Sequence, residues 1–153
     1  MTFSDKGLNF LKRREACKLK AYLDSAGIPT IGYGTIRYLD GTIVDIGDTI
    51  SQEQADILLR VECAGILRRL EGLISIYIVQ NELDALVSFC YNIGVGGFKT
   101  STLLKKINSG SEIKEDYFTR WNKIHKDGKL VVVRGLTNRR KMEFKLFSEG
   151  IYS

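Results

Sequence analysis

The spacing of apolar positions changes along the chain and predicts first a helix, then strands, then a run of helices. Leu8, Leu11 and Glu15 follow i, i+3, i+7 spacing, which places them on one face of a helix over about residues 4–15. Residues 18–24 then alternate between apolar and polar side chains, which is typical of a strand. The chain is therefore expected to pass from helix to sheet just after Glu15.

A small antiparallel β lobe is expected over residues 17–50. Pro29 is the only proline, and its fixed φ and missing N–H suit the start of an extended segment over residues 30–34. Asp40 and Gly41 separate two short apolar runs, which is a strong signal for a two-residue hairpin turn. These features predict strands joined by tight turns.

The apolar period becomes helical again from Ser51. Ser51 and Gln54 have the spacing of a capping box, which predicts the start of a long helix over residues 51–72. Residues 72–79 fit a strand or a helix equally. Further helices are expected over residues 81–94, 101–110 and 111–122, and from Thr137 towards the end of the chain. Asn81 and Ser101 are the expected caps of the first two, and turns are expected after Gly94 and at Asp127 and Gly128. Strands and helices in separate runs predict an α+β fold.

The length of 153 residues is expected to form one domain, residues 1–153. Its approximate parts are a first helix (1–16), the β lobe (17–50), a linking helix (51–72) and a helical lobe (73–153). The apolar run over residues 72–79 is too short to span a bilayer, so no stable membrane insertion is expected. The first residues lack the apolar segment of a secretory signal, so we expect the protein to begin in the cytoplasm.

The net charge of +5 is concentrated late in the chain. Residues 99–153 carry 13 Lys and Arg against 6 Asp and Glu. Such a basic portion favours a polyanion, an anionic membrane surface or a bacterial cell wall, although a solvated surface explains it as well. No base-reading motif occurs, and aromatic residues are not interleaved with basic ones, so no nucleic-acid partner is expected.

Glu15 and Asp24 are candidate catalytic carboxyls, and Thr30 is a candidate hydroxyl near them. Hydrolysis of a glycosidic bond needs one carboxyl that protonates the leaving oxygen and one carboxylate on the other side of the bond. The spacing between Glu15 and Asp24 allows that arrangement without requiring it. Because the chain has 18 acidic residues, a helix-end glutamate paired with an arginine explains Glu15 equally well.

The cysteines and the histidine do not indicate a metal or redox site. Cys17, Cys63 and Cys90 lie far apart without the spacing of metal ligands. Cys63 and Cys90 belong to apolar helical patterns and are expected to pack in the core. His125, the only histidine, lies in a lysine-rich turn and is expected at the surface.

The order of Glu15, Asp24, Thr30 and the TIGYG run of residues 30–34 resembles the phage-type lysozymes of glycoside hydrolase family 24. Further segments similar to that family follow in order over nearly the whole chain: residues 49–59, 80–94, 101–104, Trp121, and 134–147. Several linked motifs in order are more specific than any one of them. The family often has Gly and His where this chain has Ala16 and Thr35.

The resemblance implies a lysozyme-like α+β fold, in which a small β lobe and a larger, mostly helical lobe are joined by a long helix with a cleft between them. It implies a muramidase that cleaves the β-1,4 bond between N-acetylmuramic acid and N-acetylglucosamine in peptidoglycan. Glu15 would be the general acid, and Asp24 with Thr30 would hold the attacking water in an inverting reaction. No cofactor and no metal are implied.

By the same resemblance the protein is a monomeric phage or prophage endolysin of host cell lysis. It would stay in the host cytoplasm until a holin releases it to periplasmic or cell-wall peptidoglycan. Two alternatives remain open from the sequence. One is a decayed lysozyme scaffold that binds peptidoglycan without cutting it, and the other is a secreted antibacterial effector with the same domain.

Overall fold

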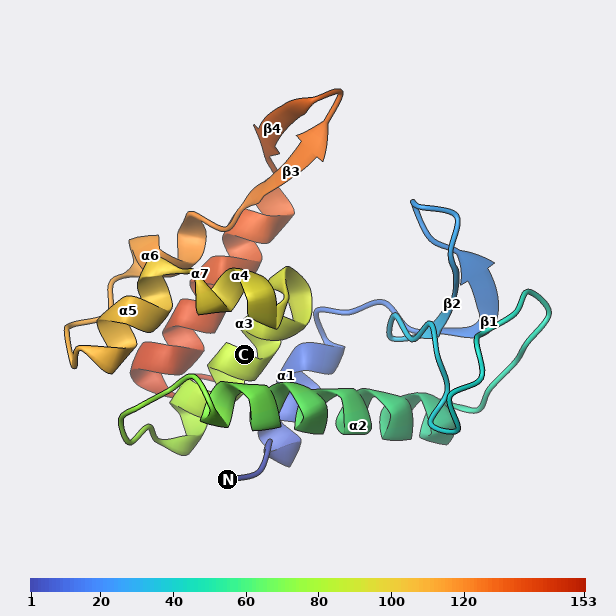
Figure 1. The fold of residues 1–153 in the computed structure, drawn as a ribbon, viewed down its shortest axis with the longest axis horizontal. Helices are drawn as coiled ribbons and strands as arrows, with labels where there is room; N and C mark the ends of the chain where they lie inside the picture. Colours follow the sequence, from blue (N-terminus) through green and yellow to red (C-terminus); the bar gives the residue numbers. More distant parts are fainter. The chain divides into compact units, whose positions relative to one another are not determined.

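Helices make up most of the regular structure, and four short strands form two separate antiparallel pairs (Figure 1). The computed structural model describes all residues, 1–153. By its internal contacts the chain divides into two units, one of Leu11–Gly65 and one of Met1–Phe10 with Ile66–Ser153. Helices α1 (Asp5–Lys12) and α2 (Gln52–Glu71) each contribute residues to both units.

The remaining elements follow in chain order. The strands are β1 (Lys18–Leu23), β2 (Pro29–Gly32), β3 (Lys123–Lys126) and β4 (Lys129–Val132). The helices are α3 (Gln80–Ile93), α4 (Val95–Lys99), α5 (Thr102–Asn108), α6 (Glu115–Thr119) and α7 (Arg134–Glu149). None of these helices, nor α1 or α2, combines the length and apolar composition needed to cross a membrane.

The unit of Leu11–Gly65 is built on the β1–β2 pair. Tyr22 pairs with Thr30, and the register is irregular between Lys18 and Tyr22. Strand β2 is buried along most of its length, whereas β1 buries only Ala21 among its six residues. Ala21 packs with Ile31 and Val44 in a small apolar core, with Tyr38 and Ile50 against it. This core is small, so hydrogen bonds and turns carry more of the local order than burial does.

The turn predicted at Asp40 and Gly41 is present, although the strands around it are not. The Tyr38 N–H donates to the Thr42 carbonyl at 2.8 Å, and Gly41 adopts φ +89°, a conformation open to glycine. Only one isolated bridge, between Arg37 and Ile43, joins the two sides. The capping box is confirmed: the Gln54 N–H donates to Ser51 Oγ at 3.1 Å, and the Ser51 N–H donates to the Gln54 amide oxygen at 2.8 Å.

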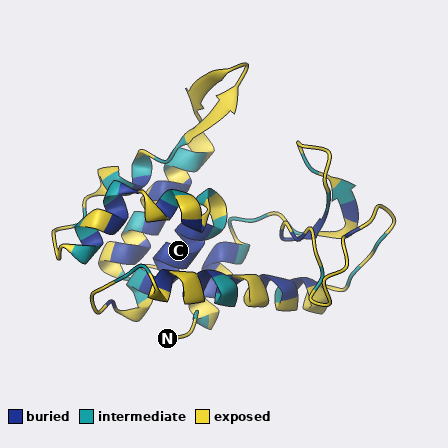
Figure 2. Ribbon diagram, in the orientation of Figure 1, coloured by how far each residue is buried: buried dark blue, intermediate teal, exposed yellow.

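In the other unit, α3 supplies the centre of the core and packs against α7. Three buried rings, Phe89, Phe98 and Phe118, meet edge to face, with centroids of Phe89 and Phe118 5.3 Å apart. Figure 2 shows the buried residues gathered along α3 and the inner side of α7. Cys90 is buried here, and Cys63 is buried in α2, as predicted; burial raises the pKa of Cys63 to about 12.

Charged side chains are buried in the same core. Glu143 and Arg140 of α7 are fully buried and form an ion pair. The other carboxylate oxygen of Glu143 accepts a hydrogen bond from Arg139 Nε at 3.0 Å and from Ser88 Oγ of α3 at 2.8 Å. Arg140 Nε also donates to the Trp121 carbonyl at 2.9 Å. The cluster therefore connects α3, α7 and the segment before β3.

Several helix predictions need correction. The helix predicted over residues 111–122 is only the short α6, and the turn predicted after Gly94 is the short helix α4. Helix α3 begins after Val79, and Asn81 does not cap it; its amide instead donates to the carbonyls of Leu146 and Phe147 in α7. The Asn81 side chain, which its position in the sequence predicts as a cap, instead forms hydrogen bonds to α7.

Two more corrections concern the end of the chain. Helix α7 begins before Thr137, whose hydroxyl donates to the Val133 carbonyl within the first turn. The turn at Asp127 and Gly128 is confirmed, with φ +52° and +75°, as a two-residue hairpin requires. It joins β3 and β4 in a hairpin that we did not predict, and His125 lies exposed on β3 rather than in the turn. Residues 72–79 are neither strand nor helix.

Candidate active site

Glu15 lies in the turn that follows α1. The helix ends at Lys12 rather than near Glu15, because the N–H groups of both Arg14 and Glu15 converge on the Leu11 carbonyl, at 2.9 and 3.1 Å. This tight turn leaves the Glu15 side chain half-buried. Its carboxyl is therefore presented from a short, hydrogen-bonded turn between α1 and β1.

Asp24 is held by the turn between β1 and β2. Its Oδ1 accepts hydrogen bonds from the N–H groups of Ala26 and Ile28, each at 2.9 Å. The Asp24 N–H donates in turn to the Ile28 carbonyl at 3.0 Å. Oδ2 makes no hydrogen bond within the protein and belongs to a half-buried residue, so this oxygen can accept from water or substrate.

Thr30 is joined to Asp24 through the backbone of Ile28. The Thr30 hydroxyl donates to the Ile28 carbonyl at 2.8 Å, the same carbonyl that accepts from the Asp24 N–H. Thr30 is buried on β2, where it pairs with Tyr22. The structure thus brings Asp24 and Thr30 into one hydrogen-bonded arrangement. Glu15 comes from a separate segment of the same unit and shares no hydrogen bond with either.

A polar network lies beside the Glu15 turn. Lys12 Nζ forms an ion pair with Asp56 Oδ2 at 2.8 Å, and the Tyr33 hydroxyl donates to Asp56 Oδ1 at 3.2 Å. The Gln52 amide donates to Asp56 Oδ1 at 2.8 Å and to the Tyr33 hydroxyl at 3.0 Å. Cys17 Sγ is 3.9 Å from the Gln52 amide oxygen. The network ties both ends of the segment carrying Glu15 to the first turns of α2.

The same contacts, together with burial, shift the pKa values of Asp56, Lys12 and Tyr33. The hydrogen bond from Lys12 lowers the pKa of Asp56 below its usual value, and that bond also raises the pKa of Lys12. Burial raises the pKa of Tyr33, which keeps its hydroxyl a hydrogen-bond donor. The charged Lys12–Asp56 pair is consequently the stable form over the neutral pH range.

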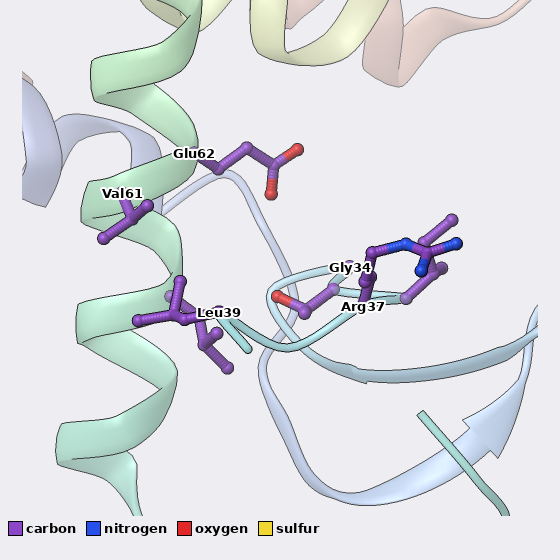
Figure 3. Close-up of a pocket in the computed structure, with 8 residues that line it drawn as sticks. Gly34, Arg37, Leu39, Val61 and Glu62 are labelled. Atoms are coloured by element: carbon purple, nitrogen blue, oxygen red, sulfur yellow. The ribbon is translucent and has the colours of Figure 1, made fainter. Parts of the chain in front are cut away.

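A hollow of about 290 Å³ lies between α2 and residues 34–39 (Figure 3). Its lining includes Gly34 and Arg37 on one side and Val61 and Glu62 of α2 on the other. Thr35 also lines the hollow. Thr35 is buried, and its backbone pairs with Ile31 in both directions, at 2.8 and 2.9 Å. Thr35 therefore supports the end of the strand that carries Thr30.

Sequence reasoning missed Ile28 and the residues of the polar network. Ile28 acts through its backbone, which leaves no side-chain signal. Tyr33 lies within the TIGYG run, but its partner Asp56 is on α2, and no local spacing links the two. Ala16 is exposed in the turn after Glu15. No group of three or more His, Cys, Asp or Glu side chains is arranged to hold a metal ion.

The chain is similar to known proteins over most of its length. A family model described as phage lysozyme matches residues 12–143. The chain belongs to the phage lysozyme family. It is a muramidase of the kind that acts in phage-mediated lysis, and its target is peptidoglycan.

Two endolysins show how far this family likeness extends in sequence. The endolysin of Acyrthosiphon pisum secondary endosymbiont phage 1 is 42% identical, over 98% of this chain and 100% of the relative. The endolysin of Salmonella phage P22 is 38% identical, over 96% of this chain and 98% of the relative. The likeness therefore runs through the whole lysozyme chain, including the segments with Glu15, Asp24 and Thr30.

A solved structure confirms the fold. The endolysin from Escherichia coli O157:H7 phage FAHEc1 matches with a TM-score of 0.93 and 42% identity, covering 100% of this chain and 97% of that one. The predicted lysozyme-like α+β class is thus confirmed.

Proposed function

We propose that this lysozyme hydrolyses the β-1,4 bond between N-acetylmuramic acid and N-acetylglucosamine with Glu15 as general acid. Asp24 and Thr30 hold the attacking water. The observation that carries the proposal is the shared use of the Ile28 backbone by Asp24 and Thr30. An arrangement that fixes two acceptor oxygens together suits a water that both of them must orient.

The hydrogen bonds that Asp24 and Thr30 already make determine which of their atoms can bind a water molecule. The Thr30 hydroxyl gives its only hydrogen to the Ile28 carbonyl, so its oxygen can only accept from the water. Asp24 Oδ1 is occupied by two N–H groups, which leaves Oδ2 as the second acceptor. A water that donates both hydrogens to Thr30 and Asp24 keeps a lone pair for the anomeric carbon.

Glu15 completes the reaction from the other side of the bond. Its protonated carboxyl donates to the leaving glycosidic oxygen while Asp24 accepts a proton from the attacking water. Direct attack by water inverts the anomeric configuration and needs carboxyl groups roughly 6.5–9.5 Å apart, to leave room for the water. The reaction uses no metal and no organic cofactor.

The polar network positions Glu15 for this step. Lys12 and Cys17 flank the Glu15 turn, and both contact the first turns of α2, through Asp56 and Gln52 respectively. The Tyr33 hydroxyl donates to the Asp56 carboxylate, and Tyr33 directly follows β2, the strand that carries Thr30. A turn fixed at both ends restricts the positions open to the acid, which is how supporting residues contribute to catalysis.

In its cellular setting the lysozyme acts as one monomeric domain in host lysis. It stays in the host cytoplasm until a holin opens the way to the peptidoglycan. The absence of a helix that could cross a membrane is compatible with release by a separate component.

Replacing Glu15 by Gln tests the proposed acid, because Gln keeps the shape and removes the transferable proton. We expect Glu15→Gln to abolish clearing of a cell-wall suspension, with unchanged circular dichroism. Glu53→Gln, an exposed change on α2 in the same unit, is the matched control and should retain full activity. Full clearing by Glu15→Gln would show that another residue is the acid.

A further inference from the structure

The β3–β4 hairpin is exposed on both of its faces. All eight residues of its two strands are exposed, whereas β2 is buried along most of its length. Figure 1 shows the hairpin extending from the start of α7, and Figure 2 shows it exposed throughout. A two-stranded hairpin without a buried face gains little stability from its own packing. The amino-acid composition of the hairpin is therefore better explained by contact with a binding partner.

The cross-strand register places apolar and cationic residues together on each face. Lys123 pairs with Val132 and His125 with Leu130, so these four share one face. The other face carries the pairs Ile124–Val131 and Lys126–Lys129. Exposure of the branched side chains is high, at 61% for Leu130, 58% for Val132 and 46% for Ile124. Exposed branched residues at this density are costly in water and suit an apolar partner.

The charge of the hairpin is positive and largely uncompensated. Lys123, Lys126 and Lys129 form no ion pair, and the one hydrogen bond among them runs from Lys123 to the neutral Asn122 side chain. Asp127 in the turn is the only acidic residue of residues 123–132. The hairpin therefore presents three available ammonium groups next to exposed aliphatic side chains.

A hollow of about 620 Å³ lies at the base of the hairpin. Its lining joins Lys123, His125 and Leu130 to the Trp121 ring and to Leu136 of α7. Aromatic, aliphatic and cationic side chains thus continue from the hairpin into a concave surface. This combination is typical of residues that sit at the level of lipid head groups.

We propose that residues 121–132 form a peripheral docking surface for an anionic phospholipid bilayer. Lysines alone would suit any polyanion, but a glycan or phosphate polymer offers no apolar phase for Ile124, Leu130 and Val132. A bilayer offers anionic head groups and, directly beneath them, hydrocarbon. The contact is peripheral and needs no inserted helix. It goes beyond hydrolysis, because it would hold the lysozyme at the membrane surface beside its substrate.

Vesicle co-sedimentation of the full chain tests the proposal. Vesicles of phosphatidylcholine with about one third phosphatidylglycerol should bind the protein, and pure phosphatidylcholine vesicles should bind it far less. The triple change Lys123→Gln, Lys126→Gln, Lys129→Gln should weaken anionic-vesicle binding on the order of 100-fold. The matched control changes three exposed lysines outside the hairpin: Lys99→Gln, Lys141→Gln, Lys145→Gln. It should lose much less binding.

A second variant separates a bilayer from other occupants. Leu130→Ser with Val132→Ser keeps every charge, and it should weaken vesicle binding at least about tenfold while leaving binding to purified cell walls unchanged. Equal loss of wall binding would identify a polyanionic wall polymer instead and overturn the proposal. A dimer that this variant dissociates in light scattering would identify a second copy and also overturn it.

Catalysis and docking can be told apart in the same samples. Both hairpin variants should hydrolyse soluble glycan fragments at the normal rate with unchanged circular dichroism. The inactive Glu15→Gln protein should still bind anionic vesicles. Absence of wild-type binding to anionic vesicles, or loss of soluble-substrate hydrolysis in a folded hairpin variant, would contradict a docking role.

Discussion

Single atoms around Ile28 determine what the proposed water site can do. The Ile28 carbonyl accepts from both the Thr30 hydroxyl and the Asp24 N–H, and the Ile28 N–H donates to Asp24 Oδ1. These bonds leave one oxygen on Asp24 and the lone pairs of Thr30 for a water molecule. The Ile28 backbone positions both Asp24 and Thr30. A substitution of Thr30 that keeps the hydroxyl should therefore cost less activity than one that removes it.

Thr30→Val should lower kcat/KM for peptidoglycan about 100-fold, because it removes one of the two acceptors that orient the water. Thr30→Ser retains the hydroxyl and should stay within about tenfold of the wild type. Initial rates on soluble glycan chains measure both variants. Equal activity of the Val and Ser variants would mean that the hydroxyl does not hold the water.

The Lys12–Asp56 pair predicts how stability depends on pH. The pKa of Asp56 is lowered in the folded state by Lys12, so the pair adds stability above the unfolded pKa of about 3.9 and loses it as the pH falls through the folded value. The raised pKa of Lys12 keeps this contribution until alkaline pH. Because both groups are partly exposed, its size is about 1 kcal/mol or less.

Asp56→Asn should therefore reduce the free energy of unfolding at pH 7, and the difference from the wild type should shrink at pH 3. Urea unfolding at both values measures it. An equal difference at pH 3 and pH 7 would show that the carboxylate charge is not the source of the stabilisation. Glu53→Gln, on the same helix turn and exposed, is the control.

The catalytic candidates could be identified from the sequence, but their supports could not. Glu15, Asp24 and Thr30 stand out because their order and the TIGYG run resemble a family pattern. Ile28 contributes only backbone atoms, and Tyr33 meets Asp56 across a distance in sequence that no local rule covers. Supporting contacts of this kind depend on tertiary structure.

Helix α7 shows how an element is fixed by buried charge. Glu143 and Arg140 are fully buried and Arg139 is nearly so, and Ser88 connects the cluster to α3. Removing one charged member of the cluster leaves the remaining charges buried and unpaired. The free-energy cost of such unpaired charges exceeds the net stabilisation that the intact ion pair provides.

Glu143→Gln should lower the free energy of unfolding by about 3–5 kcal/mol, because both arginines lose their carboxylate. For a chain of this length the melting temperature should fall by roughly 10 °C. Glu149→Gln, exposed near the end of the same helix, should shift it by no more than about 2 °C. Similar melting temperatures for the two variants would contradict a structural role for the cluster.

The elements differ in how far the sequence predicts them, and burial explains the difference. Ser51 and Ser101 cap their helices as predicted, because a cap is a local hydrogen bond. The β3–β4 hairpin was missed because no face of it is buried, so no alternation of apolar and polar residues marks it. The predicted helix over residues 111–122 was too long, because only Glu115–Thr119, which packs against α7, is helical.

The molecule as a whole combines a hydrolytic activity with a basic portion over residues 99–153. Family likeness over nearly the full chain assigns the activity, and it does not assign the stereochemistry. The proposed water between Asp24 and Thr30 predicts a single displacement, in which the β linkage yields an α product. A covalent route would keep the β configuration.

The anomer formed first is the most direct test of this mechanism. Proton NMR in the first minutes of digestion, before mutarotation mixes the anomers, reports the configuration at the new reducing end of N-acetylmuramic acid. Direct attack on the anomeric carbon by a water bound to Asp24 and Thr30 predicts that the α anomer appears first and that the β anomer accumulates later. A β anomer formed first would contradict the proposed roles of Asp24 and Thr30.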